Sequence, residues 1–542
     1  MPRTFVLRLA LVLALAACAR LESGSPDVGR ITIVDISDWH GQLEPVGVVD
    51  GGRTRQVGGA AALKTYFDAE RAANPVGTLV VTAGDAFGGT PPLSAFFDDV
   101  PAVLAANLMG IDVDTLGNHN FDHGVDRLRA LMARARFPYV AANIVAADGT
   151  RLVPPSWLVT LNGIKVGVVG IGNPETPSVV AVGRTGEFQF FPPVPAMNAE
   201  AGALRARGAE VVIVLAHVGA IAVAADGSPR GQIVEMARGA RGVDVLIGDH
   251  TDMTVNAVID GVLVVENRSK GVEYAVITVD YDRRARAVVS KTAVHKRPWT
   301  DAVRPDPTVQ ALIEEYRARS RPLFDVTVGE AAVRLDRSRQ EESRLGNLET
   351  DALRATYGTD FAFDVSGALR DDVPSTYQPA DHRLRRPAPG YSAGPPWDVV
   401  EGDFHAVFPF NNVAVTFRIS GRALWAALEN SVSHGAWVDG RYRNGVGRFL
   451  QVSGLRYTFD PRRPPGRRVV AVTRASAAPI APDETMYTAV TSDFVYNGGD
   501  GYANLANGTG VTREPIAETI SRAVRARGRV TAAVEGRINV AQ

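Results

Sequence analysis

The stretch TLGNHNFDHGVDRL, from Thr115 to Leu128, follows a short apolar run and places five metal-capable side chains within six positions. They are Asn118, His119, Asn120, Asp122 and His123. Taken singly, each has an ordinary explanation, because a strand-end Asp or Asn usually caps a helix or makes a turn. The crowding therefore indicates a metal site only if other parts of the chain show the same pattern.

The pattern recurs four times in the first half of the chain, where β-branched runs end at side chains that can bind a metal. The run RITIVDISDWHG (30–41) ends at Asp38 and His40, TLVVTAGDAFGG (78–89) at Asp85, EVVIVLAHVG (210–219) at His217, and VDVLIGDHTD (243–252) at His250 and Asp252. Such runs predict buried strands. Helical patterns lie between them, as in 127–135 and 198–210, so we expect a layered α/β domain.

Parallel or mixed strand order brings the carboxyl ends of strands to one edge of a sheet, so these side chains should meet. Imidazoles, carboxylates and an amide oxygen, without a thiolate, suit a divalent ion such as Zn, Mn, Fe or Co, and also Mg or Ca. The candidates are too many for one tetrahedral ion and suffice for two ions that share a carboxylate, for which Asp85 is the natural bridge. They are Asp38, His40, Asp85, Asn118, His217, His250 and Asp252.

Composition limits the other classes of function. The chain has 542 residues, of which 46% are hydrophobic and 22% charged, with a formal net charge of −1. This length predicts two or three domains, and the balanced charge argues against a nucleic acid polymer as a partner. No apolar run is long enough to span a membrane.

The N-terminus predicts export. Arg3 and Arg8 precede LALVLALAAC (9–18), an apolar segment too short to cross a bilayer and typical of a secretory signal. The chain's single cysteine, Cys18, follows Leu15-Ala16-Ala17, which resembles the bacterial lipobox, where the cysteine is lipidated. By this resemblance residues 1–17 are a lipoprotein signal peptide and 18–29 a tether, and Ala19 points to an outer-membrane anchor. A plain signal peptide with an incidental cysteine is the alternative.

A second domain follows the metal-site region. RPDPTVQALIEEYRARSRP (304–322) has apolar residues at helical spacing and prolines on either side, which predicts a linking helix within 301–325. Further strand-like and helical runs follow it. The predicted division is therefore a metal-binding domain over 30–300 and a second α/β domain over 326–542.

The ordered blocks DISDWHG, GDAFGG, GNHNFD, LAHVG and GDHTD resemble those of calcineurin-like metallophosphoesterases, and specifically the 5′-nucleotidase and UDP-sugar hydrolase family. The resemblance implies a four-layer α/β sandwich as the N-terminal metallophosphoesterase domain, joined by a helix to a C-terminal α/β substrate-binding domain. It assigns one ion to Asp38, His40, Asp85 and Asp252, and the other to Asp85, Asn118, His217 and His250. It makes His119 and Asp122 the catalytic dyad, in which Asp122 orients the imidazole that acts on the phosphoryl group.

The C-terminal half carries the same resemblance in RQEESRLGNLETDALRA (339–355), VSGALR (365–370), FPFNN (408–412) and DFVYNGGDGY (493–502). The substrate-binding residues that it implies are Arg339, Arg370, Phe410, Asn412, Phe494 and Asp500. Two aromatic faces can sandwich a base, with stacking worth roughly 1–3 kcal/mol per base. A carboxylate such as that of Asp500 can accept hydrogen bonds from ribose hydroxyls, and arginine forks suit a phosphate.

Three positions depart from the family pattern. Asn120 replaces a glutamate beside the dyad, Asp252 stands where a glutamine is usual, and Val365 replaces an asparagine that would bond the base or ribose. The proline-rich RRPAPGYSAGPPWD (385–398) predicts an extra surface loop.

The function that these features predict is hydrolysis of nucleoside 5′-monophosphates, and related nucleotides, to nucleoside and phosphate by metal-activated water, as part of nucleotide catabolism. Two divalent ions (Zn, Mn, Co or similar) are the expected cofactors, and the only expected membrane contact is the lipid anchor, in the periplasm or at the cell surface. The alternatives are a 2′,3′-cyclic nucleotide phosphodiesterase, a nucleotide-sugar hydrolase, or a non-catalytic nucleotide-binding lipoprotein. Monomer and dimer both remain open.

Overall fold

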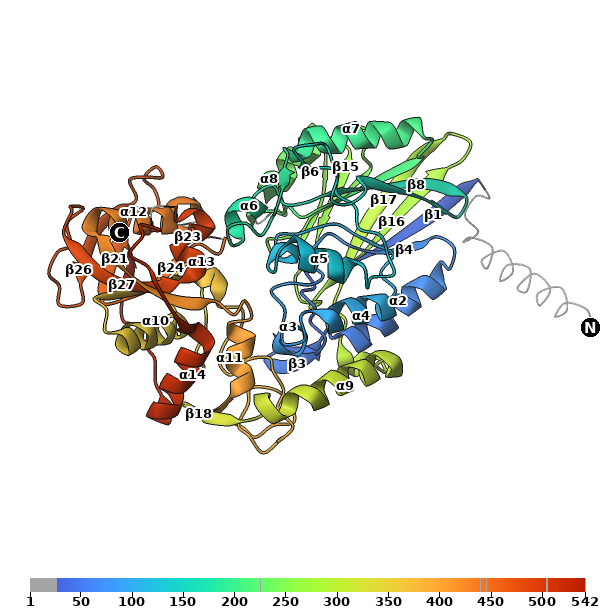
Figure 1. The fold of residues 1–542 in the computed structure, drawn as a ribbon. Coiled ribbons are helices and arrows are strands. Elements are labelled where there is room, and N and C mark those ends of the chain that lie inside the picture. The colour runs from blue at the N-terminus through green and yellow to red at the C-terminus, as the bar shows by residue number, and fades with distance from the viewer. Residues whose placement is uncertain (1–26, 225, 439, 445, 504, 542) are drawn as a thin grey trace, which may run out of the picture.

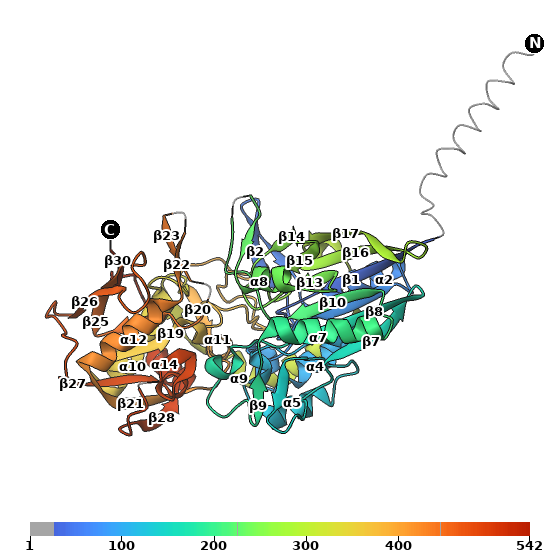
Figure 2. The ribbon, with the colours of Figure 1, turned by 90° about the horizontal axis from the view of Figure 1, so that it is seen from above.

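The computed structural model describes residues 27–541 apart from 225, 439, 445 and 504. Two α/β halves lie side by side, and helix α9 (Pro307–Phe324) runs along the lower edge of the molecule in Figure 1. Figure 2 shows the same two halves from above. Within the described part, no helix combines the length and apolar character needed to cross a membrane. The predicted signal peptide and Cys18 lie outside the described residues, and the first strand already begins at Val28, inside the predicted tether.

Two sheets form the centre of the N-terminal half. The first has the order β17 (Ala287–Lys296), β16 (Tyr274–Asp282), β1 (Val28–Asp35), β4 (Thr78–Thr82) and β5 (Val113–Asp114). The second has the order β14 (Val255–Ile259), β15 (Val262–Glu266), β13 (Val245–Ile247), β10 (Val211–Ala216), β8 (Ile164–Ile171) and β7 (Ser156–Leu161). Both are mixed sheets: the parallel strands β1, β4 and β5 lie at one edge of the first, and β15, β13, β10 and β8 form a parallel centre in the second.

The two sheets pack face to face between two helical layers. Alternate residues of β10 face opposite ways: Ile213 joins the core between the sheets, together with Ile33, whereas Val214 joins the core under the helices. Helices α7 (Pro193–Ala206) and α8 (Gln232–Gly239) cover that outer face, and α2 (Ala60–Ala73), α4 (Val100–Met109) and α5 (Val125–Met132) cover the other sheet. The predicted four-layer α/β sandwich is confirmed.

Within each sheet, the strands that precede the predicted ligands are parallel to one another. Strands β1, β4 and β5 run parallel in one sheet, and β10 and β13 run parallel in the other. The five runs quoted above therefore divide between two sheets, which their sequences do not reveal, because a strand buried on both faces carries no mark of the sheet it joins.

The C-terminal half is built on a five-stranded sheet with the order β24 (Leu450–Ser453), β19 (Phe361–Val365), β27 (Met486–Ser492), β21 (Val413–Ser420) and β28 (Val511–Pro515). Helices α10 (Arg344–Tyr357) and α14 (Ile516–Arg527) share a core with one face of this sheet, and α12 (Gly421–Ser433) with the other. Two three-stranded sheets flank it, β20 (Trp397–Val400), β18 (Thr327–Ala331) and β29 (Arg529–Val530), and β26 (Val469–Arg474), β25 (Leu455–Phe459) and β30 (Ile538–Val540).

Helix α9 contacts both halves. The Asp306 carboxylate caps its first turn by accepting hydrogen bonds from the backbone N–H groups of Thr308 and Val309. Val309 and Ile313 are buried against α2 and α4, and the last turn of α9 packs against α11 (Glu401–Val407).

The proline-rich segment 385–398 is anchored at Arg386, which is only 3% exposed. Its guanidinium makes two hydrogen bonds of 2.6 and 2.7 Å to the buried Asp403 carboxylate and one of 2.9 Å to the Tyr377 carbonyl. The segment lies at the surface as predicted, but Arg386 anchors it in the interior, which composition does not show, because Asp403 is its partner only in the fold.

Candidate active site

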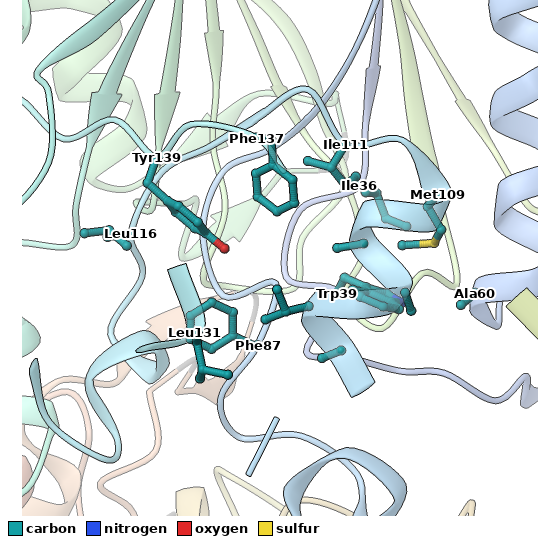
Figure 3. Close-up of a cluster of buried hydrophobic side chains, with 14 of the residues drawn as sticks. Ile36, Trp39, Ala60, Phe87, Met109, Ile111, Leu116, Leu131, Phe137 and Tyr139 are labelled. Carbon is teal, nitrogen blue, oxygen red and sulfur yellow. The ribbon is translucent and has the colours of Figure 1, made fainter. Parts of the chain in front are cut away.

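Three of the ligand-bearing loops carry a large apolar side chain close to the polar one. Trp39 separates Asp38 from His40, Phe87 follows Asp85 by two positions, and Leu116 precedes Asn118 by two. All three belong to one buried cluster with Tyr139 and Ile36 (Figure 3). The packed apolar cluster therefore holds the polar side chains in place at the strand ends.

The backbone is strained at the same positions. Among the described residues, fourteen other than glycine have positive φ, including five predicted metal ligands. These five are Asp38 (53°), His40 (50°), Asp85 (49°), His250 (85°) and Asp252 (55°). A conformation that costs about 1–3 kcal/mol per residue persists where the surrounding structure imposes it, and it clusters at functional sites.

The structure brings most of the predicted ligands into two adjoining groups. Ligand atoms of His40, Asp85 and His119 all lie within 4.8 Å of one another, and so do those of Asp38, His217 and Asp249. His250 stacks edge-on against His217, with ring centroids 5.1 Å apart. The two sheets therefore deliver carboxylates and imidazoles to the same place.

Several buried polar atoms make no hydrogen bond within the described structure, and they show whether these two groups fit a cation. They include Asp38 Oδ1, Asp85 Oδ2, Asn118 Oδ1 and His217 Nε2. Orphaned polar atoms are rare in protein interiors because desolvation costs them about 1–3 kcal/mol each. Four such atoms on four predicted ligands fit a bound cation.

The hydrogen bonds of the histidine rings give a second indication that the groups fit a cation. His217 Nδ1 lies 3.0 Å from the Ala83 carbonyl, and His40 Nδ1 lies 2.7 Å from the Gly88 carbonyl. A carbonyl only accepts hydrogen bonds, so both Nδ1 atoms carry a proton, and each Nε2 atom can hold a metal ion or a second proton. His217 Nε2 faces Asp85 Oδ2 at 2.9 Å. Although burial acts in the opposite direction, Asp85 and Asp249 raise the pKa of His217 well above its ordinary value. A positive charge, carried by a second proton or by a metal ion, therefore belongs between the two atoms.

Local charge keeps the acids ionised. Although burial acts in the opposite direction, nearby histidines hold the pKa of Asp38 well below its usual range and that of Asp85 at about 2. Burial and the neighbouring His217 lower the pKa of His250 to about 3, so this imidazole stays neutral. Ionised carboxylates and a neutral imidazole are the forms that bind metals.

Asn120 connects two ligand loops. Its side-chain oxygen accepts a hydrogen bond of 2.7 Å from the Gly117 N–H, and its amide nitrogen donates one of 3.0 Å to the Phe87 carbonyl. The residue that replaces the family's glutamate therefore ties the loop of Asn118 to that of Asp85.

His119 and Asp122 form the predicted pair. His119 Nδ1 lies 3.0 Å from Asp122 Oδ2, which also accepts a hydrogen bond of 3.0 Å from the Gly89 N–H. The imidazole lies edge-on to His40 and is stacked on Phe410, with centroids 5.5 Å apart and an interplanar angle of 9°. The C-terminal half thus reaches the dyad directly.

Two residues near the cluster differ from expectation. The Asp252 carboxylate is in neither ligand group; it accepts a hydrogen bond of 2.8 Å from the Ser269 N–H and pairs with Arg268. Asp249, which we did not predict, lies inside the second group and accepts hydrogen bonds from the backbone of Asp38 and His250. Its position directly before His250 was the available signal, but an acid after a strand ordinarily indicates a turn.

The predicted substrate residues are only partly gathered. The Arg370 guanidinium lies 5.7 Å from the Phe410 ring centroid. Burial lowers the pKa of Arg370, and the charges of Asp38 and Asp85 act in the opposite direction. Burial and the neighbouring Arg370 and Arg337 lower the pKa of Arg339 to about 9. Asn412 is turned away to donate to the Asp493 carboxylate at 2.8 Å.

Phe494 and Asp500 lie where the two halves meet. Phe494 lines an open cavity of about 480 Å³ together with residues 181–184 of the N-terminal half. Asp500 has a φ of 53° and is nearly buried; burial raises its pKa to about 6, against the opposing effect of Arg448. This carboxyl therefore changes charge near neutral pH.

Comparison with known proteins finds similarity to 5′-nucleotidases. Residues 326–507 match the model of the 5′-nucleotidase C-terminal domain. Human 5′-nucleotidase is 27% identical over 92% of this chain and 88% of its own, and endonuclease YhcR of Bacillus subtilis (strain 168) is 27% identical over 90% of this chain. The chain spans only 38% of the length of YhcR.

A solved structure also resembles this chain over nearly its whole length. The 5′-nucleotidase precursor from Thermus thermophilus is 28% identical, covers 94% of this chain and 99% of its own, and superposes with a TM-score of 0.82. The similarity extends over both halves and the helix between them.

The role of Asn120 gives a testable prediction. Replacing it with alanine removes the connection between two ligand loops, and loss of such support typically lowers metal affinity about 10–100-fold. We expect Asn120→Ala to lose Zn²⁺ or Mn²⁺ to a chelator at correspondingly lower chelator concentration. Asn107 is the matched control, since its amide also joins two segments, by bonds to Arg134 and Arg136, away from the ligands. Equal metal retention by Asn120→Ala and Asn107→Ala would refute the role.

Proposed function

Because the chain belongs to the 5′-nucleotidase family of metal-dependent phosphoric ester hydrolases, we propose that it hydrolyses nucleoside 5′-monophosphates to nucleoside and phosphate. One observation carries the proposal. The His119 imidazole, bonded to Asp122, stands between the ligand cluster of one half and Phe410 of the other. Such a ring can act on a phosphate held at the ligands while the attached nucleoside extends into the C-terminal half.

We assign two divalent ions to the cluster, with Asp38, His40 and Asp85 for one and Asp85, Asn118, His217 and His250 for the other. We also propose Asp252 as a further ligand of the first ion, because its carboxylate oxygens, which accept from the Ser269 N–H and pair with Arg268, each have a second lone pair. When bound, such a pair of ions supplies a water of lowered pKa and positive charge for the phosphoryl oxygens.

The protein groups supply the rest. With Nδ1 held by Asp122, the His119 ring presents Nε2, from which it can donate a proton to a phosphoryl oxygen or to the departing alcohol. The Asp122 carboxylate stabilises the imidazolium form of His119, which becomes a neutral imidazole when it gives up this proton. Arg339 and Arg370 hold the phosphate, Phe410 and Phe494 offer faces to the base, and Asp500 accepts from the ribose hydroxyls.

We also propose that the chain is exported and anchored through a lipid on Cys18. The support is the sequence of residues 1–18. In a bacterial host, Cys18→Ser should move the protein from the membrane fraction to the soluble fraction without changing its specific activity. Recovery of the variant in the membrane fraction at the wild-type level would contradict the anchor.

The proposed role of His119 predicts how its removal affects phosphate release. His119→Ala should lower kcat for phosphate release from AMP by about 10²–10⁴-fold, the usual contribution of a general acid. Metal content measured on the same sample should stay at the wild-type level. His123→Ala is the control, because His123 is exposed and four positions away.

Screening 2′,3′-cyclic nucleotides and nucleotide sugars beside AMP separates the alternative substrates. Full turnover of AMP by His119→Ala would remove His119 from the mechanism. Failure of metal-loaded wild-type protein to release phosphate from AMP would overturn the proposed function.

Asp500 predicts a pH dependence. Its pKa of about 6 means that the carboxyl is protonated below that pH and ionised above it. The ionised form accepts the stronger hydrogen bonds from ribose, by about 1.5–3 kcal/mol for a charged partner. Between pH 5 and pH 7, kcat/KM for AMP divided by that for phenyl phosphate, which lacks ribose, should rise about tenfold. The ratio should be flat in Asp500→Asn; a wild-type ratio that is also flat would exclude this role.

A further inference from the structure

Helix α10 carries an acid in the middle of the stripe that it buries against the C-terminal sheet. The core between them includes Leu345, Leu348, Ala352 and Leu353 of the helix. Glu349 completes the i, i+3, i+4, i+7, i+8 spacing of this helix face. It is only 1% exposed, and neither of its carboxyl oxygens has a hydrogen-bond partner within the described structure. An ionised carboxylate at such a position is costly unless another group neutralises it.

A second acid lies on the sheet face that this stripe covers. Asp364 follows Ala362 by two positions on β19, and Ala362 belongs to the same core as the leucines of α10. The cross-strand neighbour of Asp364 is Gln451. Gly346, one turn before Glu349, lies so close that a Cβ there would be 2.3 Å from Gln451 Cγ. Asp364 is fully buried and its Oδ2 is also without a partner, so two unpaired carboxyl groups lie together between α10 and the sheet.

The groups around this pair add negative charge to it. Burial, with the charge of Asp364 acting in the same direction, raises the pKa of Glu349 well above its usual range. Burial also raises the pKa of Asp364 to about 7, although the hydrogen bond from Ser492 opposes it. The charges of Asp493 and Asp500 add to the increase. At neutral pH the two acids therefore hold at least one proton between them.

Other charged side chains on the neighbouring elements do not face the pair. Those of α14 are exposed, and β24 has none. The remaining charged residues of α10 are engaged elsewhere: Arg344 with Asp336, Arg354 with Ser453, and Asp351 with Arg537. Two carboxyl groups among leucine and alanine side chains also cannot supply the six or more oxygens that Ca²⁺ takes. A shared proton is therefore the group that suits this pair.

Asp364 also holds two segments that are predicted to bind the nucleotide. Its Oδ1 accepts hydrogen bonds of 2.7 Å from Ser492 Oγ and 2.8 Å from the Val365 N–H. Ser492 Oγ in turn accepts one of 3.3 Å from the Val495 N–H, and so caps the short helix that carries Phe494. The position of this proposed base-binding ring thus depends on Asp364 through one serine.

On the premise of the proposed nucleotide hydrolysis, we propose that Glu349 and Asp364 share one proton and that Asp364, held in this way, is a positioning residue for the nucleoside. The proton lies between a Glu349 oxygen and Asp364 Oδ2, which leaves Oδ1 to accept from Ser492. Its loss leaves two adjacent buried carboxylates, whose repulsion loosens the segment of Phe494. Because both pKa values are higher in the fold than in the unfolded chain, the pair stabilises the fold most at acid pH, and this contribution is lost as the pH rises.

Glu349→Gln tests the shared proton, because glutamine keeps the shape of the side chain and always offers an N–H to Asp364. Between pH 7 and pH 9, KM for AMP divided by KM for phenyl phosphate should rise about tenfold in the metal-loaded wild type, the effect of losing one hydrogen bond. The ratio should stay flat in Glu349→Gln and be raised already at pH 7 in Glu349→Leu. Glu518→Gln, which changes an exposed acid of α14, is the control and should follow the wild type.

Hydrogen exchange of residues 492–500 in the full chain separates this inference from the proposed function. After correction for the intrinsic pH dependence of exchange, the opening equilibrium of the wild type should grow by up to about tenfold per pH unit relative to Glu349→Gln, the slope for one linked proton. If the wild type releases no phosphate from AMP, the proposed function fails, while exchange still decides the pair. Equal pH dependence in wild type and Glu349→Gln would overturn the inference. So would suppression of the alkaline opening by added K⁺ or Ca²⁺, because a bound cation would then take the place of the proton.

Discussion

The structure of the N-terminal half depends on one close approach, that of His217 Nε2 to Asp85 Oδ2 at 2.9 Å. The Ala83 carbonyl fixes a proton on the other ring nitrogen, so Nε2 faces the buried carboxylate oxygen and needs a second proton or a metal ion between them. Asp85 follows β4 of one sheet and His217 follows β10 of the other. The sandwich of two sheets brings these two atoms together, and a positive charge between them offsets the cost of burying the Asp85 carboxylate.

The second half contributes through the ring of His119. This imidazole is held at Nδ1 by Asp122, at its edge by His40 and on its face by Phe410. The first two contacts come from the N-terminal half and the third from the C-terminal half. The orientation of the proposed acid therefore depends on how the halves are placed, and the same Phe410 ring also lies beside the Arg370 guanidinium. One aromatic side chain therefore contacts both the proposed phosphate-binding arginine and the proposed proton donor.

The sequence predicted those parts of the site that local pattern determines. A β-branched run followed by Asp, His or Asn is visible without tertiary information, and each of the five runs with predicted ligands became a strand whose following loop carries a residue of the cluster. Partners distant in sequence were not predictable. Asp249 reads as a turn residue and Lys270 as part of a polar loop, and only the fold brings Asp249 against His217 and Lys270 against Arg370. Arg386 was missed for the same reason, since its burial requires Asp403.

Asn120 shows how a departure from a family pattern acquires a meaning from geometry. By sequence it is a glutamate position that has lost a charge beside the dyad. In the fold, however, the side chain must accept from the Gly117 N–H and donate to the Phe87 carbonyl, and an ionised glutamate can only accept. A carboxylate would also add negative charge beside Asp85, whose low pKa depends on the positive character of its surroundings. The amide makes both hydrogen bonds and leaves that balance intact, so the substitution is compatible with the ligand cluster.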